Sequence, residues 1–494
     1  MKHSKKPHVL LISTDQWPGH LLGATGRKDI DTPTLDQMAR NGVRFSNFFS
    51  ECPVCIPARR SMMTGTDPRT HGDRVFTPDK LMPDLPLLAD VFRTFGYQTG
   101  AVGKLHVYPA RNRIGFEDVV SFEEGRPQLG GPDDWELYLA DHGEAGNGYA
   151  HGMSNNGYEF RPWHLSESQH PTQWLTRQMC RMIQRRDPTR PQFWHLSYNF
   201  PHPPIVPLAA YLDAYGARDM EAPLEGNWAK DTKALPWALQ KVLQSWPELS
   251  RDQNKAMRRA FYAQCTQIDH QLRLVIGTLR EQLLLDDTII MFTSDHGDML
   301  GDHGLYAKRL MYRGSVQVPM IVMPPADDER IEPGAVDDRF VGMQDIMPTL
   351  LSMAGLDVPD SCTGRSMIEG DRREAFYCEA MEDGSATRMI ADGRWRLIWY
   401  PAGNHVQLFD METDPRELHD LASAAEFADD RKRLERRLVD CLYGVDLEWV
   451  RDGRLVGFTP PDLPPATNRG LSGQRGLHYP EPPKGDVSKV VGAP

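Results

Sequence analysis

Runs of apolar residues that end in polar clusters recur along the chain. Four such runs occupy residues 8–14, 97–103, 192–200 and 288–294, and stretches with helical patterns separate them. Buried strands that alternate with helices are typical of a mostly parallel sheet covered on both faces. We therefore predict an α/β fold, with a large mixed, mostly parallel sheet sandwiched by helices. In such sheets the ligand lies beyond the carboxyl ends of the strands.

Cap signals place two of the helices. Thr32 is a helix N-cap followed by proline, and an Asn-Gly pair at 41–42 ends that helix. Ser250 and Gln253 have the spacing of a capping box. Apolar residues then recur at helical spacing over 257–279, which predicts one long amphipathic helix.

The pattern changes after about residue 370. Alternating apolar and polar residues around an Asp-Gly pair at 392–393 predict antiparallel strands joined by a tight turn. A charged helix is expected from about Ala425 to Leu442, and the chain from Arg454 is rich in Pro and Gly. We expect three regions: a large α/β domain over 1–370, a small antiparallel α+β subdomain over 371–453, and a tail over 454–494. The tail is either disordered or laid against a partner subunit.

Composition narrows the class of protein. The 494 residues are 40% apolar and 25% charged, which is typical of a globular protein. The net charge of −12, without a basic stripe, argues against a nucleic-acid partner. No run approaches the about 18 apolar residues of a membrane span, and the first is too short for a signal peptide. Seven scattered cysteines do not resemble a disulfide framework, so we expect a cytoplasmic protein without a membrane partner.

The densest chemical signal is the motif Cys55-Ile-Pro-Ala-Arg59, followed by Thr-Gly at 64–65. The proline sits where a helix would begin, which places Cys55 at a helix N-terminus, where free N–H groups favour an anion. Arg59, one turn later, can return toward residue 55. Cys52 and Cys55 also form a Cys-x-x-Cys pair, so a redox site and a purely structural Cys55 remain alternatives.

Polar pairs follow two of the apolar runs. Asp15 and Gln16 follow the first run, and Asp295 and His296 follow the last. Such side chains suit a divalent cation such as Ca²⁺, with Mg²⁺ and Mn²⁺ as alternatives. A single aspartate after a strand is often only a turn residue, so the two pairs carry weight together and not separately.

Four further residues are candidates. Lys104 and His106 stand two apart at a strand end and point the same way, so both can meet one anion. His202 is the one ionisable group of a proline-rich loop, and Lys308 lies twelve residues beyond His296. Neighbouring residues that could surround the site or contact the substrate are Asp298, Asp302, His303 and Arg309.

Together these motifs resemble the type I, formylglycine-dependent sulfatases of the alkaline phosphatase superfamily, in particular choline sulfatase-like and arylsulfatase-like members. The match runs from the first strand to residues 408–418, which resemble the family's C-terminal subdomain. The resemblance implies that a formylglycine-generating enzyme oxidises Cys55 to formylglycine. It also implies one divalent metal, with Ca²⁺ first, bound by Asp15, Gln16, Cys55, Asp295 and His296. Many sulfatases carry Asp in place of Gln16 and Asn in place of His296, which leaves the metal's identity open.

The resemblance implies a sulfuric ester hydrolase whose catalytic residues are Cys55, Arg59, Lys104, His106, His202 and Lys308. A hydroxyl of the hydrated aldehyde attacks sulfur, with Asp295 as the first choice of base. Lys104, Lys308 and Arg59 neutralise the charge on the sulfate oxygens. His202 or Lys308 protonates the leaving alkoxide, and His106 deprotonates the second hydroxyl, which releases sulfate.

Other functions stay open. A phosphonate monoester or phosphodiester hydrolase of the same superfamily shares the cysteine and both metal-binding pairs, although the Lys-x-His of 104–106 favours sulfate. A silent binding protein that keeps Cys55 as a thiol is a further alternative. The expected substrate is a small aryl, choline-like or sugar sulfate, and aromatic residues within 107–175 and 205–250 either stack on it or belong to the core. The long tail suggests a homo-oligomer.

Overall fold

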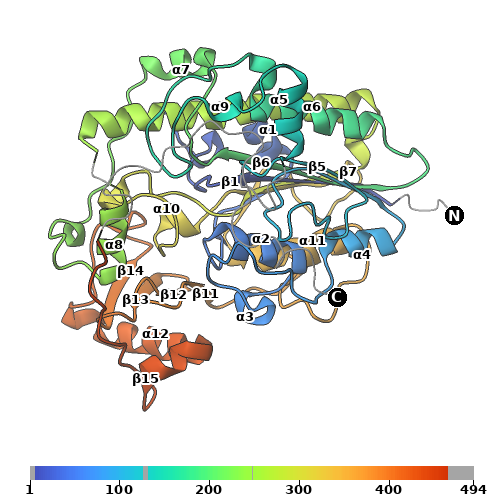
Figure 1. Ribbon diagram of the computed structural model, residues 1–494. Helices are drawn as coiled ribbons and strands as arrows, with labels where there is room; N and C mark the ends of the chain where they lie inside the picture. The colour runs from blue at the N-terminus through green and yellow to red at the C-terminus, as the bar shows by residue number, and fades with distance from the viewer. Residues whose placement is uncertain (1–5, 126–131, 247–248, 466–494) are drawn as a thin grey trace, which may run out of the picture.

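The computed structural model describes residues 6–125, 132–246 and 249–465, and it has the predicted α/β architecture (Figure 1). An eight-stranded sheet forms the centre of the larger part of the protein. Its strand β8 runs antiparallel to both neighbours, whereas the other pairs are parallel. In spatial order the strands are β5 (Asp118–Ser121), β4 (Gln98–Gly103), β6 (Gln192–Pro201), β1 (His8–Asp15), β7 (Thr288–Ser294), β8 (Met320–Met323), β2 (Val43–Phe45) and β9 (Ala335–Asp337).

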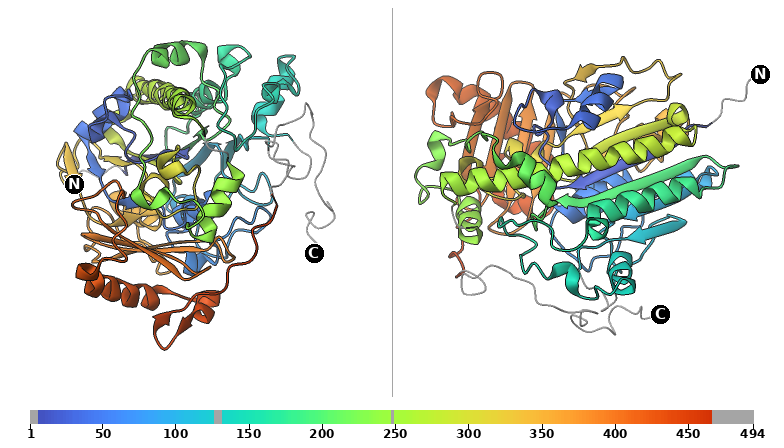
Figure 2. Two further views of the ribbon diagram at one scale, coloured as in Figure 1. Left: turned by 90° about the vertical axis from the view of Figure 1, so that its left-hand side faces the viewer. Right: turned by 90° about the horizontal axis from the view of Figure 1, so that it is seen from above.

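Helices cover both faces of this sheet (Figures 1 and 2). Alternate residues of β1 face opposite layers: Leu10 and Ile12 pack with α1, α6 and α9, and Val9 and Leu11 pack with α2, α4 and α11. The helices are α1 (Pro33–Asn41), α2 (Cys55–Thr64), α3 (Pro68–His71), α4 (Leu88–Thr94), α5 (Asp134–Asp141), α6 (Pro171–Gln184), α7 (Ala209–Gly216), α8 (Trp237–Ser245), α9 (Arg251–Glu281), α10 (Arg313–Val316), α11 (Ile346–Met353) and α12 (Ala428–Cys441). Within the described part of the chain, none of them has both the length and the apolar character of a membrane span.

The ends of α1 and the start of α9 confirm the cap predictions. Helix α1 begins directly after Thr32, and Ser250 and Gln253 form the capping box of α9. The Thr32 side chain itself makes no cap bond. Instead, the buried carboxylate of Asp269 on α9 accepts the backbone N–H groups of Thr34 and Leu35, at 3.0 and 2.8 Å. A side chain of α9 thus caps the N-terminus of α1.

The smaller part is an antiparallel sheet of four strands with one helix. The Asp-Gly turn predicted at 392–393 joins β12 to β13. One face of the sheet packs against the large domain, and the other packs against α12. The strands are β11 (Phe376–Ala380), β12 (Thr387–Asp392), β13 (Trp395–Tyr400) and β14 (His405–Asp410). Two short pairs complete the strands: β3 (Phe48–Phe49) with β10 (Val341–Gly342), and β15 (Val450–Arg451) with β16 (Arg454–Leu455).

The described start of the expected tail lies against its own chain. The Phe458 ring packs 4.9 Å from the ring of Trp449. Further along, the carbonyl of Pro461 accepts the indole N–H of Trp237 at 2.7 Å. Residues 454–465 therefore continue the packed structure, and the rest of the expected tail, 466–494, lies outside the described residues.

The contact between α9 and α1 gives a first prediction. Replacing Asp269 with Ala leaves the N–H groups of Thr34 and Leu35 without acceptors, so the free energy of unfolding should fall by about 2 kcal/mol. Urea denaturation followed by circular dichroism measures the change. Arg273→Ala, an exposed position on the same helix, is the control and should change stability by less than about 0.5 kcal/mol. Equal stability of the two variants would contradict the role given to Asp269.

Candidate active site

The carboxyl ends of four adjacent strands bring the predicted residues to one edge of the large sheet (Figure 1). Asp15 is the last residue of β1, and Lys104, His202 and Asp295 directly follow β4, β6 and β7. Cys55 is the first residue of α2, as the sequence predicted. Residues that are up to 280 positions apart in the sequence, such as Asp15 and Asp295, therefore meet because parallel strands end at a common edge.

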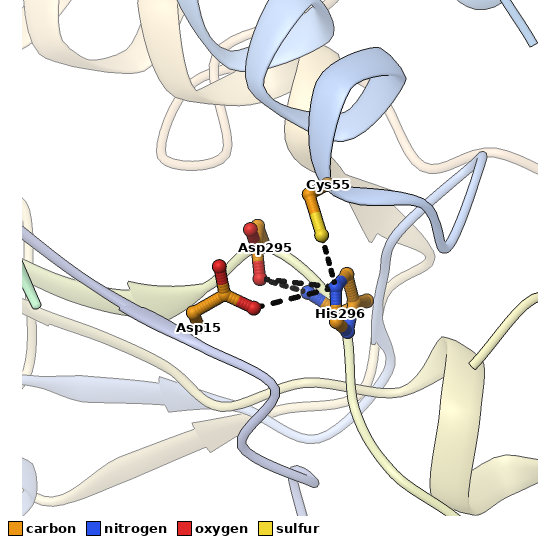
Figure 3. Close-up of side chains that lie close together, drawn as sticks. All are labelled: Asp15, Cys55, Asp295 and His296. Carbon is orange, nitrogen blue, oxygen red and sulfur yellow. Dashed lines mark hydrogen bonds and ion pairs between the residues drawn. The ribbon is translucent and has the colours of Figure 1, made fainter. Parts of the chain in front are cut away.

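Four buried side chains form a group that fits a divalent cation (Figure 3). Ligand atoms of Asp15, Cys55, Asp295 and His296 all lie within 4.8 Å of one another. His296 Nδ1 lies 3.0 Å from the carbonyl of Gly297, so a proton on Nδ1 leaves Nε2 as a bare acceptor. That Nε2 lies 3.1 Å from Cys55 Sγ and 3.5 Å from Asp15 Oδ1.

One atom of this group indicates that the cluster is built for a ligand. Asp15 Oδ1 is buried and has no hydrogen-bond partner among the described residues. Buried carboxylate oxygens are nearly always bonded, because leaving one unsatisfied costs free energy. Two carboxylates and an imidazole nitrogen are ligands that divalent cations accept, so the residues present fit a metal at this place.

Arg59 ties the two carboxylates to neighbouring strands. Its Nε donates to Asp295 Oδ2 at 2.9 Å, and its Nη1 donates to the carbonyl of Lys104 at 2.7 Å and to Ser197 Oγ at 2.9 Å. Burial opposes the charge, but Asp295 and then Asp15 raise the pKa of Arg59 above its usual value. The sequence suggested that Arg59 turns toward residue 55. Its hydrogen bonds among the described residues go elsewhere, because the buried carboxylates and the carbonyl take up its N–H groups.

Lys104 is held in the site by its backbone and by two carboxylates. The preceding Gly103 has a φ of 111°, and a side chain there would come within 1.9 Å of the carbonyl of Ser197. The Lys104 ammonium pairs with Asp15 and, at 2.9 Å, with Glu124. Burial alone would raise the pKa of Asp15, but Lys104 and the other nearby cations hold it well below its usual value.

Lys308 and His202 form the second polar group of the site. Lys308 Nζ lies 2.7 Å from both Gln16 Oε1 and His202 Nε2. Burial, together with Lys308, lowers the pKa of His202 to about 3, so this histidine is neutral. Its Nδ1 lies 2.8 Å from the carbonyl of Pro203, so the ring donates from Nδ1 and accepts from Lys308 at Nε2. The Gln16 side chain faces Lys308, and its metal-binding role stays a prediction.

The loop that carries Lys308 is fixed by the residue that follows it. The backbone N–H of Arg309 donates to Pro53 at 3.1 Å, and its carbonyl accepts the hydroxyl of Thr387, on β12, at 3.1 Å. The exposed Arg309 guanidinium lies 5.9 Å from the ring centre of Phe76. Phe76 in turn meets the ring of His106 edge-on, with centroids 5.9 Å apart. Lys308 is half-buried and Arg309 exposed, so the site meets solvent on this side.

Backbone strain gathers at the same place. Gln16, His106, Glu124 and Arg309 have left-handed φ values of 71°, 57°, 59° and 76°. Such conformations are unfavourable for residues other than glycine, and they persist where the surrounding structure imposes them, most often at functional sites. The strain therefore supports the placement of the site independently of the side chains.

The two cysteines of the Cys-x-x-Cys pair face different groups. Cys55 Sγ faces His296, whereas Cys52 Sγ donates to the carbonyl of Arg74 at 3.6 Å. All seven cysteines are free. Burial raises the pKa of Cys52 well above its usual value. Burial and Asp15 raise the pKa of Cys55 too, but Lys308, His296 and Lys104 lower it below the ordinary value. The two sulfurs thus have different surroundings and different partners.

Some residues of the site escaped the sequence analysis, and others assigned to it lie elsewhere. Glu124 binds Lys104, and the Glu123 carboxylate accepts the backbone N–H of His106 at 3.2 Å. Both follow β5, so the strand-end rule that found Asp15 and Asp295 could have found them. Two of the neighbouring candidates, Asp302 and His303, bind other partners: Asp302 pairs with Arg258 at 2.5 Å, and His303 accepts the N–H of Gly226 at 3.1 Å.

Comparison with known families settles the class of protein. A family model described as Sulfatase matches residues 7–356, which is more than half of the chain and includes every strand end described above. This chain belongs to the sulfatase family. A second family model, described as N-sulphoglucosamine sulphohydrolase, C-terminal, matches residues 301–443 of this sulfatase. The protein is thus a sulfatase enzyme, which hydrolyses sulfate esters.

Relatives and solved structures agree with this assignment. The sulfatase is 32% identical over 486 residues to an arylsulfatase of Clostridium perfringens, covering 92% of this chain and 98% of the relative. It is 29% identical to a choline-sulfatase of Rhizobium meliloti, covering 84% and 82% of the two chains. The crystal structure of a phosphonate monoester hydrolase of Agrobacterium radiobacter superimposes with a TM-score of 0.77 at 24% identity, covering 92% of this chain and 100% of that one. That likeness shows the fold alone.

The buried group around Asp15 predicts metal binding that can be measured directly. Asp15→Asn removes one ligand charge, so the affinity of the metal-depleted sulfatase for Ca²⁺, Mg²⁺ or Mn²⁺ should fall at least about tenfold. Isothermal titration calorimetry of each cation measures the affinity. Asp118→Asn, an exposed carboxylate at the start of β5, is the matched control and should leave it unchanged. If Asp15→Asn bound the cations as tightly as the wild type, the prediction that this group binds a metal would be wrong.

Proposed function

We propose that this sulfatase cleaves a small organic sulfate monoester with a formylglycine made from Cys55 and one divalent cation, Ca²⁺ being the first choice. The observation that carries the proposal is the position of Cys55. Its Sγ stands at the N-terminus of α2, 3.1 Å from His296 Nε2 and inside the group that also contains Asp15 and Asp295. A nucleophile derived from this residue would lie next to the cation.

The two groups added to the chain would supply reactivity. The cation, held by Asp15, Asp295 and His296, would draw charge from a bound oxygen, and the hydrated aldehyde at position 55 would offer the attacking hydroxyl. The maturation step requires a formylglycine-generating enzyme. A thiol alone is a weaker explanation of the site, because Lys104, Lys308 and the cation all favour an oxyanion beside it.

The chain's own residues bind the sulfate and orient the reaction. Lys104 and Lys308 present ammonium groups toward the group around Asp15, and these can hold sulfate oxygens. Arg59 pairs with both carboxylates and so fixes their positions, and we assign it a positioning role. Asp295 accepts from Arg59 on one oxygen and from the N–H of His296 on the other, at 2.9 Å each. Because both oxygens are held in this way, we favour the role of metal ligand for Asp295 over the role of general base that the sequence suggested.

The leaving alcohol needs a proton when the S–O bond breaks, and we propose Lys308 as its source. Lys308 donates to His202 Nε2, and His202 is neutral because burial and Lys308 lower its pKa to about 3. The histidine therefore aims the ammonium and is not itself the acid. His106, beside the opening at Phe76, stays our proposal for the base that deprotonates the second hydroxyl and lets sulfate leave.

The substrate class rests on the relatives and on the two lysines. An arylsulfatase and a choline-sulfatase are among the relatives, which supports an aryl or choline-like sulfate, with a sugar sulfate as a third form. The rival activity is hydrolysis of phosphonate monoesters or phosphodiesters, because a phosphonate monoester hydrolase shares the fold. Lys104 is buried in the site and paired there with Asp15, and it favours sulfate as the group bound.

Conversion of Cys55 is the first test. The sulfatase is produced with a formylglycine-generating enzyme, and mass spectrometry of the tryptic peptide that ends at Arg59 should show the mass of the aldehyde in place of the thiol. Cys55→Ser should retain at most one turnover, because a serine sulfate ester has no second hydroxyl to expel sulfate. A control sulfatase from the same cells verifies the maturation step. An unmodified thiol beside a converted control would contradict the proposal, as would faster turnover of an aryl phosphonate than of the matching aryl sulfate.

The proton-donor role of Lys308 predicts a dependence on the leaving group. Lys308→Met should lower kcat for an alkyl sulfate by about 100-fold or more, since the departing alkoxide needs a proton. The loss should be much smaller with 4-nitrophenyl sulfate, whose phenolate leaves without one. Steady-state kinetics of both substrates measure the ratio, with Lys230→Met, an exposed position, as the control. An equal loss of kcat on both substrates would contradict the proton-donor role and would leave sulfate binding as the role of Lys308.

A further inference from the structure

A second site lies in a cavity of about 430 Å³ beside the active site. Its walls come from the loop after β1, from α9, from the start of α10 and from residues 416–417 of the C-terminal subdomain. None of the predicted catalytic or metal-binding residues lines it. The cavity holds Asp302 and His303, which explains why these two candidates do not join the catalytic group.

The charged side chains of this cavity are unevenly matched. The cations of its lining are Arg27, Lys28, Arg258, Arg313 and Arg416, and the acids are Asp29, Glu221, Asp302 and Glu417. Each acid is already engaged: Asp29 with Arg27, Glu221 with Arg27 and Arg416, Asp302 with Arg258, and Glu417 with Arg396. No carboxylate of the lining therefore remains to pair with the other cations.

Two cations of the lining have no carboxylate partner among the described residues: Lys28, which is exposed, and Arg313, which is half-buried. Among the described residues the Arg313 guanidinium has no hydrogen bond and no carboxylate within ion-pair distance, and the side chain is half-buried. The nearest acid, Glu417, accepts the backbone N–H of Arg313 at 2.9 Å and pairs with Arg396 instead. Burial lowers the pKa of Arg313, and the charge of Glu417 offsets this effect only in part. Such a group is costly unless a ligand meets it.

A second polar atom in the cavity also lacks a partner. His20 Nδ1 is buried without a hydrogen-bond partner in the described part of the chain. Burial lowers the pKa of His20, and the guanidinium groups of Arg313, Arg27, Arg258 and Arg416 lower it further. These four arginines and His20 line the same cavity, so an anion bound there would lie among their positive charges.

We propose that this cavity binds a small oxyanion, a sulfate or phosphate group, with Arg313 and His20 as its principal ligands. A guanidinium presents two parallel N–H donors, which match two oxygens of a tetrahedral anion. Arg27, Arg258 and Arg416 add positive charge around it without giving up their own carboxylates. The volume lies in the range of cavities that hold small organic ligands, so the anion can carry an organic part. Asp15, Cys55, Asp295 and His296 do not line the cavity, so the proposal is for binding of the anion and includes no hydrolysis there.

The cavity and the active site share a wall. The N–H of Gly297, the residue after His296, donates to the carbonyl of Ser315 at 2.8 Å, and Ser315 lies two residues beyond Arg313. Met299, which lines the cavity, follows Asp298, whose carboxylate accepts from Gln16. Because both sites accept an oxyanion, the test has to separate binding at Arg313 from product binding at Lys308.

The test measures thermal unfolding and titration calorimetry of the full chain with sodium sulfate and, separately, sodium phosphate, at constant ionic strength set with chloride. Three variants are compared with the wild type: Arg313→Met removes the half-buried unpaired cation, Lys308→Met weakens the active site, and Arg93→Met is a control at an exposed, paired arginine of α4. Without added oxyanion, Arg313→Met should melt at least as high as the wild type, because it removes an unpaired, half-buried charge from a cavity that three other arginines line. With oxyanion, the wild type, Lys308→Met and Arg93→Met should gain stability at the cavity, whereas Arg313→Met should bind at least tenfold more weakly.

His20→Asn serves as a second variant and should also weaken oxyanion binding. A stronger effect of sulfate or of phosphate identifies the preferred anion, and either supports the proposal. Two results would overturn it: Arg313→Met and His20→Asn respond to both anions as the wild type does, or the whole response disappears in Lys308→Met, which would place the binding in the active site. Loss of stability in Arg313→Met without added anion would assign Arg313 a structural role and would also overturn it.

Discussion

Two carboxylates, Asp15 and Asp295, lie without solvent exposure at the carboxyl edge of the large sheet, and the arrangement around them follows from that burial. A buried carboxylate is tolerated only where cations and N–H groups meet it. Arg59 reaches both, so α2 is tied to β1 and β7, and Lys104 ties β4 to β1. The ion pairs that link these strands therefore also fix the position of Cys55, because α2 begins at that residue.

Much of this edge could be predicted from the sequence because parallel strands are buried on both faces. Such a strand is apolar along its whole length, so the first polar residue marks where it ends and where a ligand can approach. That reasoning located Asp15, Lys104, His202 and Asp295, and the structure places all of them at adjacent strand ends. Helix caps could also be predicted from the sequence, because a cap depends on residues three or four positions apart. The prediction that Cys55 is the reactive residue rests on the resemblance of its motif to that of a known family.

The rest depends on which distant segments pack together. Strand β5, which precedes Glu123, is short and only partly buried, so it lacks the apolar run that marked the other strands. The hydrogen bonds of Arg59 could not be predicted, since its partners lie on β1 and β6 and directly after β4 and β7. Asp302 and His303 stand close to Asp295 in sequence, yet a left-handed residue, φ 57° at His303, turns this stretch toward a different cavity. Nearness in sequence does not fix direction.

The bond between Thr387 and the carbonyl of Arg309 has a consequence for how such enzymes diverge. It makes one strand of the C-terminal sheet a support for the loop that carries Lys308, so the two regions cannot change independently. The C-terminal family model begins at residue 301, ahead of that loop, and so includes both. The unit that evolution can exchange between sulfatases is then the loop together with its sheet. A recombination that joined the sheet of one enzyme to the loop of another would separate a lysine from the scaffold with which it was inherited.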